Sequence, residues 1–231
     1  MGPTILASPD EAVALIPDGA SIMFGGFISA GVPANLIRAL VRRGTRDLTG
    51  IATNIGPDDE LDALCIGGQL RAMIASFAIR ATTQRSSEFE RLWRAGKVDL
   101  ELVPQGTLAE RIRAGGAGIR AFYVPTGAGT VVAAGKETRV IDGRLCVLEE
   151  GLTADFALIR AQAADRAGNL IYRGAGRNFN VPMATAARTV IAEVAEIVET
   201  GALDPELVVT PGIYVDYLVQ CEAVAIAWRR W

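Results

Sequence analysis

One stretch decides the fold of this chain: Asp18-Gly19-Ala20-Ser21-Ile22-Met23-Phe24-Gly25-Gly26-Phe27-Ile28-Ser29-Ala30-Gly31-Val32-Pro33. Its apolar run at residues 22–24 predicts a short buried strand that ends at paired glycines, and Pro33 suits the first turn of a following helix. A strand, a glycine loop and a helix start can bring backbone N–H groups close to a ligand. Glycines also serve a plain strand-to-helix turn, so the spacing leaves both interpretations open.

Strands and helices alternate along the rest of the chain, and glycine-rich turns follow several strands. Further strands are expected at residues 48–52, 72–78, 98–103, 122–124, 138–141, 145–148, 156–161, 169–172 and 189–198. This alternation predicts an α/β fold in which helices cover an open parallel or mixed sheet. No linker or repeat interrupts it, so residues 1–231 are expected to form one domain.

Local signals predict where several elements begin and turn. Ser8 followed by Pro9 predicts a helix start, and Gly44 a helix end. Residues 107–110, Thr107-Leu108-Ala109-Glu110, match a capping box with Thr107 at the N-cap. Asn180 is expected to cap another helix, and Asp142-Gly143 predicts a tight hairpin.

Composition excludes several classes of function. The chain has 231 residues, half of them hydrophobic, but no window of about 18 apolar residues that a membrane span needs. We therefore expect an ample core and a buried subunit interface. A net charge of −3 with scattered signs argues against a nucleic-acid partner. The N-terminus lacks a basic segment, so no signal peptide is expected.

Cysteine and histidine usage restricts the chemistry further. Three cysteines lie far apart in the sequence, which argues against disulfides and metal sites and fits the cytoplasm. Histidine is absent, so Ser-His-Asp triads, Cys-His pairs and His-Glu-x-x-His zinc sites cannot form within this chain.

A few polar residues are candidates for chemistry. Gln105 follows an expected strand between Pro104 and Gly106, where its amide is placed to donate to a developing oxyanion or simply to cap the turn. Asn54 and Asn180 lie in comparable loops and carry the same two interpretations. Arg80 and Arg85 lie in a polar loop, either paired with an anionic substrate or solvated.

The acidic pair Glu149-Glu150 is a weaker candidate. Adjacent residues of a strand point to opposite faces, so the two carboxylates are not a general acid and base. A solvated strand end is the expected structure. The aromatic and basic tail at residues 228–231 suits either a partner contact or a frayed terminus.

Taken together, these motifs resemble the A (alpha) chain of the family I 3-oxoacid CoA-transferases from about residue 8 to residue 220. The stretch from Asp18 to Pro33 has every position of that family's first signature. Further typical segments are residues 103–113 (Val-Pro-Gln-Gly-Thr-Leu-Ala-Glu-Arg-Ile-Arg), 115–118, 154–159, 167–170, 177–180 and 210–213. Their common order makes the resemblance specific.

The resemblance implies the open α/β fold of CoA-transferases, which sugar-phosphate isomerases and ligand sensors share in related form. It implies an A2B2 assembly with a CoA-transferase B subunit, with CoA as a substrate and no permanently bound cofactor. The nucleophilic glutamate of the family lies in a Glu-Asn-Gly motif of the B subunit. This chain has no such motif. The chain alone is therefore expected to be inactive.

The resemblance also assigns roles to residues. It makes Gln105 the oxyanion donor and identifies Gly25, Gly26, Phe27, Ile28, Ser29, Ala30 and Gly31 as the segment that contacts CoA. Asn54 keeps one asparagine of a family Ser-Asn-Asn-Ala-Gly motif, whereas Thr53 departs from it.

The expected donor is succinyl-CoA, and the expected acceptor is 3-oxoadipate rather than acetoacetate, with Arg80 or Arg85 binding its second carboxylate. The alternative is a non-catalytic module that binds an acyl-CoA or a sugar phosphate, because related folds host both. A third possibility is a purely structural A subunit whose loops only shape the site of its B partner.

Overall fold

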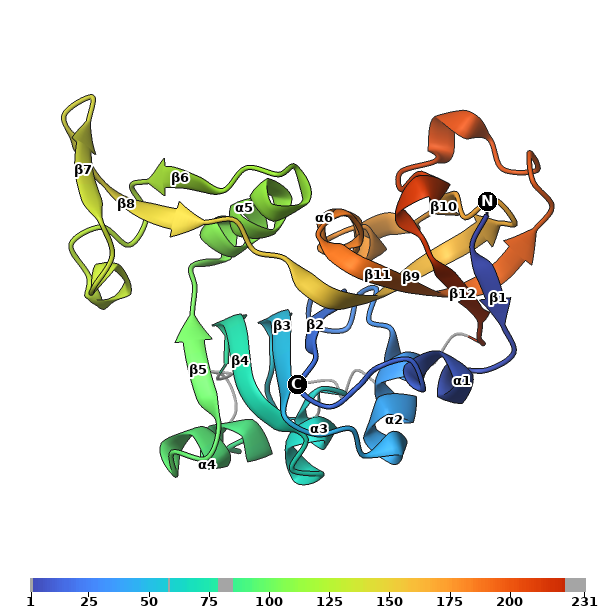
Figure 1. Cartoon of the computed structure of the whole chain (residues 1–231), viewed down its shortest axis with the longest axis horizontal. Coiled ribbons are helices and arrows are strands. Elements are labelled where there is room, and N and C mark those ends of the chain that lie inside the picture. The colour runs from blue at the N-terminus through green and yellow to red at the C-terminus, as the bar shows by residue number, and fades with distance from the viewer. Residues whose placement is uncertain (1, 58, 79–84, 223–231) are drawn as a thin grey trace.

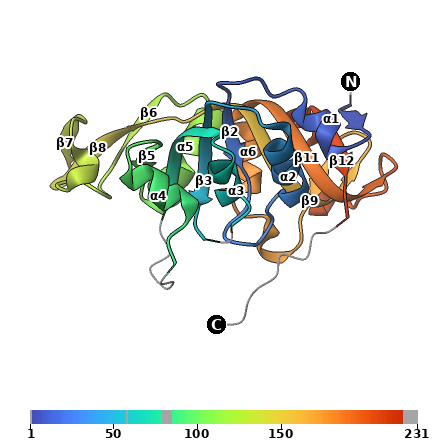
Figure 2. The same cartoon turned by 90° about the horizontal axis from the view of Figure 1, so that it is seen from below.

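The computed structural model describes residues 2–57, 59–78 and 85–222 (Figure 1). Within them, a nine-stranded sheet forms the body of the molecule and a three-stranded sheet lies at one end (Figures 1 and 2). The main sheet runs in the order β1 (Thr4–Leu6), β12 (Tyr217–Gln220), β11 (Ala187–Val198), β9 (Ala154–Asp165), β2 (Ser21–Phe24), β3 (Leu48–Asn54), β4 (Leu70–Phe77) and β5 (Asp99–Leu102). These neighbours are parallel, and β10 (Leu170–Ile171) joins β9 antiparallel. The predicted mixed α/β sheet is confirmed.

Helices cover both faces of this sheet. Helices α1 (Pro9–Val13), α2 (Ala34–Arg43), α3 (Asp62–Ile66) and α4 (Glu88–Arg94) pack on one face, which is nearest the viewer in Figure 2. Helices α5 (Gln105–Gly116) and α6 (Asn180–Thr185) pack on the other. Short 3₁₀ helices occupy Val131–Ala133, Gly174–Gly176, Pro205–Leu207 and Gly212–Tyr214.

Strand β2 lies inside this sandwich, as its apolar run predicts. Ile22 and Phe24 belong to the core under α1–α4, while Met23 belongs to the core under α5 and α6. All three side chains are almost fully buried. A strand covered on both faces needs a continuous apolar run rather than an alternating one.

The small sheet consists of β6 (Ala121–Val124), β8 (Arg144–Glu150) and β7 (Thr138–Ile141), paired antiparallel in that order. The predicted hairpin at Asp142-Gly143 is confirmed. Both residues have positive φ, 47° and 75°, as a two-residue turn of this hand requires.

Helix ends are confirmed at some positions and wrong at others. Ser8 caps α1 by accepting the N–H of Glu11, and Gly44 ends α2 with a φ of 74°. The capping box at Thr107 is wrong, because α5 already begins at Gln105. Thr107 is buried beside Leu108 on the sheet-facing side, so tertiary packing outweighs the local capping signal. Asn180 is likewise the first helical residue of α6 and not its cap.

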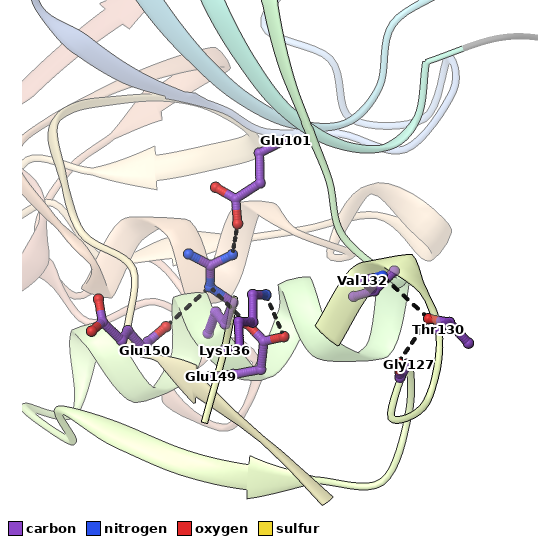
Figure 3. Close-up of polar contacts among 8 residues, drawn as sticks. Glu101, Gly127, Thr130, Val132, Lys136, Glu149 and Glu150 are labelled. Carbon is purple, nitrogen blue, oxygen red and sulfur yellow. Dashed lines mark hydrogen bonds and ion pairs between the residues drawn. The ribbon is translucent and has the colours of Figure 1, made fainter. Parts of the chain in front are cut away.

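The expectation of a solvated Glu149 is also wrong (Figure 3). Its side chain is 1% exposed, and its carboxylate lies 2.7 Å from Lys136 Nζ and 3.8 Å from Arg111 Nε. Arg111 also donates to the Glu150 carbonyl (3.0 Å) and to Glu101 Oε1 (2.5 Å). The carboxylate is buried because it neutralises cations between α5 and the small sheet. Glu150 is exposed, so the two adjacent carboxylates do point to opposite sides, as expected.

Within the described ranges, no helix is both long and apolar enough to cross a membrane. The same part of the chain holds no group of three or more Cys, Asp or Glu residues arranged to bind a metal ion.

Candidate functional site

The strand order places the glycine loop, residues 25–31, at a recognisable point of the sheet. From β2 the chain builds β3, β4 and β5 outward on one side, whereas β9, β11 and β12 lie on the other side. The boundary between β2 and β9 is therefore a topological switch point. Open α/β sheets bind ligands at the carboxyl ends of the strands that flank such a point. The glycine loop follows the carboxyl end of β2.

The loop is closed on itself. Phe27 and Ala30 exchange both backbone hydrogen bonds, each 3.0 Å. Gly26, Ile28 and Gly31 have positive φ values of 108°, 54° and 69°. The value at Ile28 is unusual for a β-branched residue and is the kind of backbone strain that surrounding contacts must hold in place.

Asn54 at the end of β3 supplies such a contact. Its Oδ1 accepts the N–H of Ile28 at 2.8 Å, and its Nδ2 donates to Asp59 Oδ2 at 2.9 Å. The Thr53 hydroxyl lies 3.2 Å from the Gly26 carbonyl and 2.9 Å from Asn54 Oδ1. Asn54 and Thr53, the residue that differs from the family motif, thus hold the glycine loop from the end of β3. Direct contact of Asn54 with a ligand stays a prediction.

Several N–H groups of the loop are already engaged, and three are not. Gly25 donates to the Leu158 carbonyl at 2.9 Å, and the bonds above use Phe27, Ile28 and Ala30. Among the residues that the structure describes, the N–H groups of Gly26, Ser29 and Gly31 meet no acceptor. Contact of these three N–H groups with a ligand stays a prediction.

The start of helix α2 does not serve as an anion site. Glu193 on β11 is fully buried and accepts the N–H groups of Asn35 (2.9 Å) and Leu36 (3.1 Å). Its other oxygen contacts Asn35 Nδ2 and Arg160. A carboxylate from the protein itself therefore occupies the helix N-terminus. The charged residue inside the apolar run of residues 190–194 was the sequence signal that could have revealed this role.

The structure brings Gln105 to the glycine loop. An open hollow of about 280 Å³ is lined by Phe27, Gln105, Ala109, Asn178, Phe179 and Pro182. Gln105 is half-buried at the first position of α5, and no hydrogen bond ties its side chain to another described residue. Donation by its amide to a ligand oxygen in this hollow stays a prediction. The glycine loop, through Phe27, and the glutamine, which were predicted separately from the sequence, meet at this hollow.

Arg85, one of the two arginines predicted to bind a substrate carboxylate, does not line this hollow. Arg85 lines a different hollow of about 300 Å³, together with Asp59, Glu60 and Asp62. Arg80 lies outside the described residues, as does the tail at residues 228–231.

Asn178 and Asn180 contact the glycine loop from α6 and the segment before it. From the sequence, Asn180 was a candidate oxyanion donor, whereas Asn178 was singled out for no role of its own. Asn180 is fully buried, and its amide bonds to main-chain groups, so it does not face a ligand.

Cys65 and Cys221 are not activated as nucleophiles. Burial raises the pKa of Cys65 to about 12 and that of Cys221 to about 11. Both groups are therefore protonated thiols at neutral pH, and thiolate is the reactive form. All three cysteines are free.

The chain is similar to known proteins over nearly its whole length. It is 53% identical over 216 residues to the 3-oxoadipate CoA-transferase A subunit of Pseudomonas putida, covering 93% of this chain and 92% of that protein. It is 48% identical over 216 residues to the probable succinyl-CoA:3-ketoacid coenzyme A transferase A subunit of Bacillus subtilis, covering 93% and 89%. A crystal structure of the decarboxylase AibA/AibB superposes with a TM-score of 0.81 and 28% identity, covering 96% of this chain and 84% of that one.

The fold is that of an α/β protein whose glycine-rich loop lies at the switch point of its sheet. The family model described as coenzyme A transferase matches residues 6–221. The chain belongs to the coenzyme A transferase family, and the resemblance seen in its motifs is confirmed.

Proposed function

We propose that this chain is the A subunit of a heteromeric 3-oxoacid CoA-transferase and that it works only together with a B subunit. The relatives from Pseudomonas putida and Bacillus subtilis are both named as A subunits, and by those names they transfer CoA to or from 3-oxoacids. The observation that carries the proposal is the hollow in which Gln105 meets the glycine loop. The whole chain, residues 1–231, acts as one domain in this assembly, which we propose to be A2B2.

Gln105 stabilises the oxyanion in this proposal. Transfer of an acyl group passes through tetrahedral intermediates, and preorganised donors lower their free energy. Gln105 is half-buried at the first position of α5 and borders the hollow beside the glycine loop. The residues that contact CoA are those of the glycine loop, Gly25, Gly26, Phe27, Ile28, Ser29, Ala30 and Gly31, with Asn54 holding them.

The nucleophile comes from the B subunit. A glutamate of that partner takes CoA from succinyl-CoA, releasing succinate and forming a glutamyl-CoA thioester. The carboxylate of the 3-oxoacid then takes CoA from the enzyme and restores the free glutamate. This chain has neither a Glu-Asn-Gly motif nor a histidine, which supports the proposal that the B subunit supplies the nucleophile.

The proposed acceptor is 3-oxoadipate. The relative with 53% identity is named for this acid, and the relative with 48% identity is named for 3-ketoacids generally. Arg85 lies at another hollow, so the distal carboxylate is not assigned to it.

The test is to purify the chain alone and with a B subunit encoded next to it. Each sample receives succinyl-CoA with 3-oxoadipate, acetoacetate or acetate, and both the new CoA ester and released CO₂ are measured. Transfer by the complex, with 3-oxoadipate the best acceptor and no transfer by the chain alone, is the expected result. CO₂ release without transfer would favour a decarboxylase like the structural relative, and neither product would favour a binding module.

A further inference from the structure

Asn180 satisfies three main-chain groups with one side chain. It is fully buried at the start of α6. Its Oδ1 accepts the N–H of Arg160 on β9 at 2.9 Å, and its Nδ2 donates to the carbonyls of Gly31 at 2.9 Å and Gly176 at 2.8 Å. The amide thereby joins a central strand, the glycine loop and the segment before α6. A buried main-chain N–H or carbonyl without a hydrogen-bond partner lowers the stability of the fold. We therefore expect few other side chains to replace Asn180 at this position.

The glycine loop is shaped around this amide. A Cβ atom at Gly25 would lie 1.8 Å from Asn180 Oδ1, and one at Gly31 would lie 2.7 Å from Asn180 Nδ2. Neither distance is possible for a real side chain. The position of Asn180 therefore requires glycine at position 25. At position 31 it adds to two other reasons for glycine, the positive φ and the Gly176 carbonyl, which a Cβ would also approach to 2.7 Å.

Asn178 also contacts the glycine loop, on the side that faces the hollow. Its Nδ2 donates to the carbonyls of Ala30 at 2.9 Å and Ala175 at 2.6 Å. Asn178 also lines the hollow that contains Gln105 and Phe27. The loop is thus held on the α6 side by Asn178 and Asn180 and on the β3 side by Asn54.

We propose that Asn180 is a positioning residue for CoA transfer, which sets the place of the glycine loop relative to Gln105. The inference rests on the proposed function. Catalysis depends on reacting groups held in productive geometry, and a displacement of about 1 Å costs on the order of 10²-fold in rate. Asn180 acts through the loop and does not touch substrate.

The first test compares Asn180→Ala and Asn180→Asp in the complex with the B subunit. Asn180→Asp keeps the shape and Oδ1 but places an oxygen against the carbonyls of Gly31 and Gly176. Both variants should lower kcat on the order of 10²-fold, while KM for the 3-oxoacid changes less than about twofold. Asn169→Ala is the matched control, because Asn169 makes comparable bonds to Asp165 and Gly212 at a distant turn. It should lower the melting temperature but leave kcat unchanged.

The second test uses the close approach of Gly25. Gly25→Ala alone should impair transfer, because its methyl group displaces the loop from Asn180. In Gly25→Ala/Asn180→Ala the methyl no longer meets Oδ1, so the double variant should be no slower than Asn180→Ala. If the fold-losses in kcat of the two single variants multiply in the double variant, the two positions act independently, and the proposal is overturned.

The third measurement does not depend on activity. In the complex, amide hydrogen exchange of residues 25–32 should become at least about 10-fold faster in Asn180→Ala and stay unchanged in Asn169→Ala. Unchanged exchange, or wild-type kcat in Asn180→Ala, would overturn the inference. A wild-type complex that transfers no CoA would instead contradict the proposed function, and the exchange experiment would still test the contact.

Discussion

At the scale of single residues, Gln105 is the proposed oxyanion donor. It is half-buried, and its side chain has no hydrogen-bond partner among the described residues. It follows Pro104, opens α5 and borders the hollow beside Phe27. In the proposed role, Gln105 contributes only when negative charge develops on an acyl oxygen. Its removal should therefore affect the chemical step and leave ground-state binding nearly unchanged.

The substitution Gln105→Ala in the complex should lower kcat by about 10²-fold or more, with a small change in KM for succinyl-CoA. Steady-state kinetics of CoA transfer measures both constants. Gln162→Ala is the matched control, because Gln162 is an exposed glutamine on β9. Equal kcat values for the two variants would contradict the proposal that Gln105 stabilises the oxyanion.

Asp155 gives a pH-dependent prediction. The Ser21 hydroxyl and N–H donate to its carboxylate at 2.7 Å and 3.0 Å, which lowers the pKa of Asp155 below its ordinary value of 3.8. A lowered pKa stabilises the fold above pH 3.8, and this stability is lost as the pH falls through the folded value. Wild type should thus lose more stability than Asp155→Asn between about pH 7 and about pH 3.

Urea unfolding of both proteins at several pH values measures this difference. Ser21→Ala removes the same contact from the other side, so it should flatten the pH dependence in the same direction. Parallel stability curves for wild type and Asp155→Asn would show that the contact does not persist in solution.

At the scale of elements, α2 has no side-chain cap of its own, because Pro33 occupies the N-cap position. Glu193 from the distant strand β11 supplies the missing acceptor and also pairs with Arg160. One buried carboxylate therefore joins the helix after the glycine loop to the centre of the sheet.

Glu193→Ala should lower the free energy of unfolding by about 3 kcal/mol or more, because it leaves Arg160 and two helix N–H groups without their acceptor. Denaturant unfolding measures this loss. Glu196→Ala is the control, since Glu196 is exposed on the same strand, and it should change stability by less than about 0.5 kcal/mol. Similar effects for the two variants would contradict the capping role.

Arg111 connects the small sheet to the body of the molecule. Its side chain is 10% exposed and contacts Glu101 on β5 and Glu149 on β8. Arg111→Ala leaves the Glu149 carboxylate buried with less compensation, so it should cost about 3 kcal/mol of unfolding free energy.

Arg113→Ala provides the comparison, because the Arg113–Glu110 pair is exposed and such pairs contribute little, about 0.5 kcal/mol or less. The two variants can be measured side by side by thermal unfolding. A loss for Arg111→Ala as small as that for Arg113→Ala would mean that solvent replaces the buried network.

At the scale of the whole molecule, most strands were predicted from the sequence because they are short apolar runs separated by glycine and polar turns. The strands β1 and β12, at one end of the strand order, were not predicted. The sequence also predicted Gln105 and the glycine loop as separate motifs. It did not predict that they share one hollow, because their meeting depends on how α5 packs over the sheet. Glu149 and Glu193 were missed for a related reason: a charge inside a strand is buried only when distant partners such as Lys136 and Arg160 neutralise it.

The central claim is that this chain supplies a loop and an oxyanion donor while the B subunit supplies the nucleophile. Intact-mass spectrometry of the complex, after incubation with succinyl-CoA and no acceptor, tests it directly. The expected result is a mass gain corresponding to a CoA thioester on the B subunit, discharged by adding 3-oxoadipate, with no change in the mass of this chain. A CoA adduct on this chain, or transfer by this chain alone, would contradict the claim.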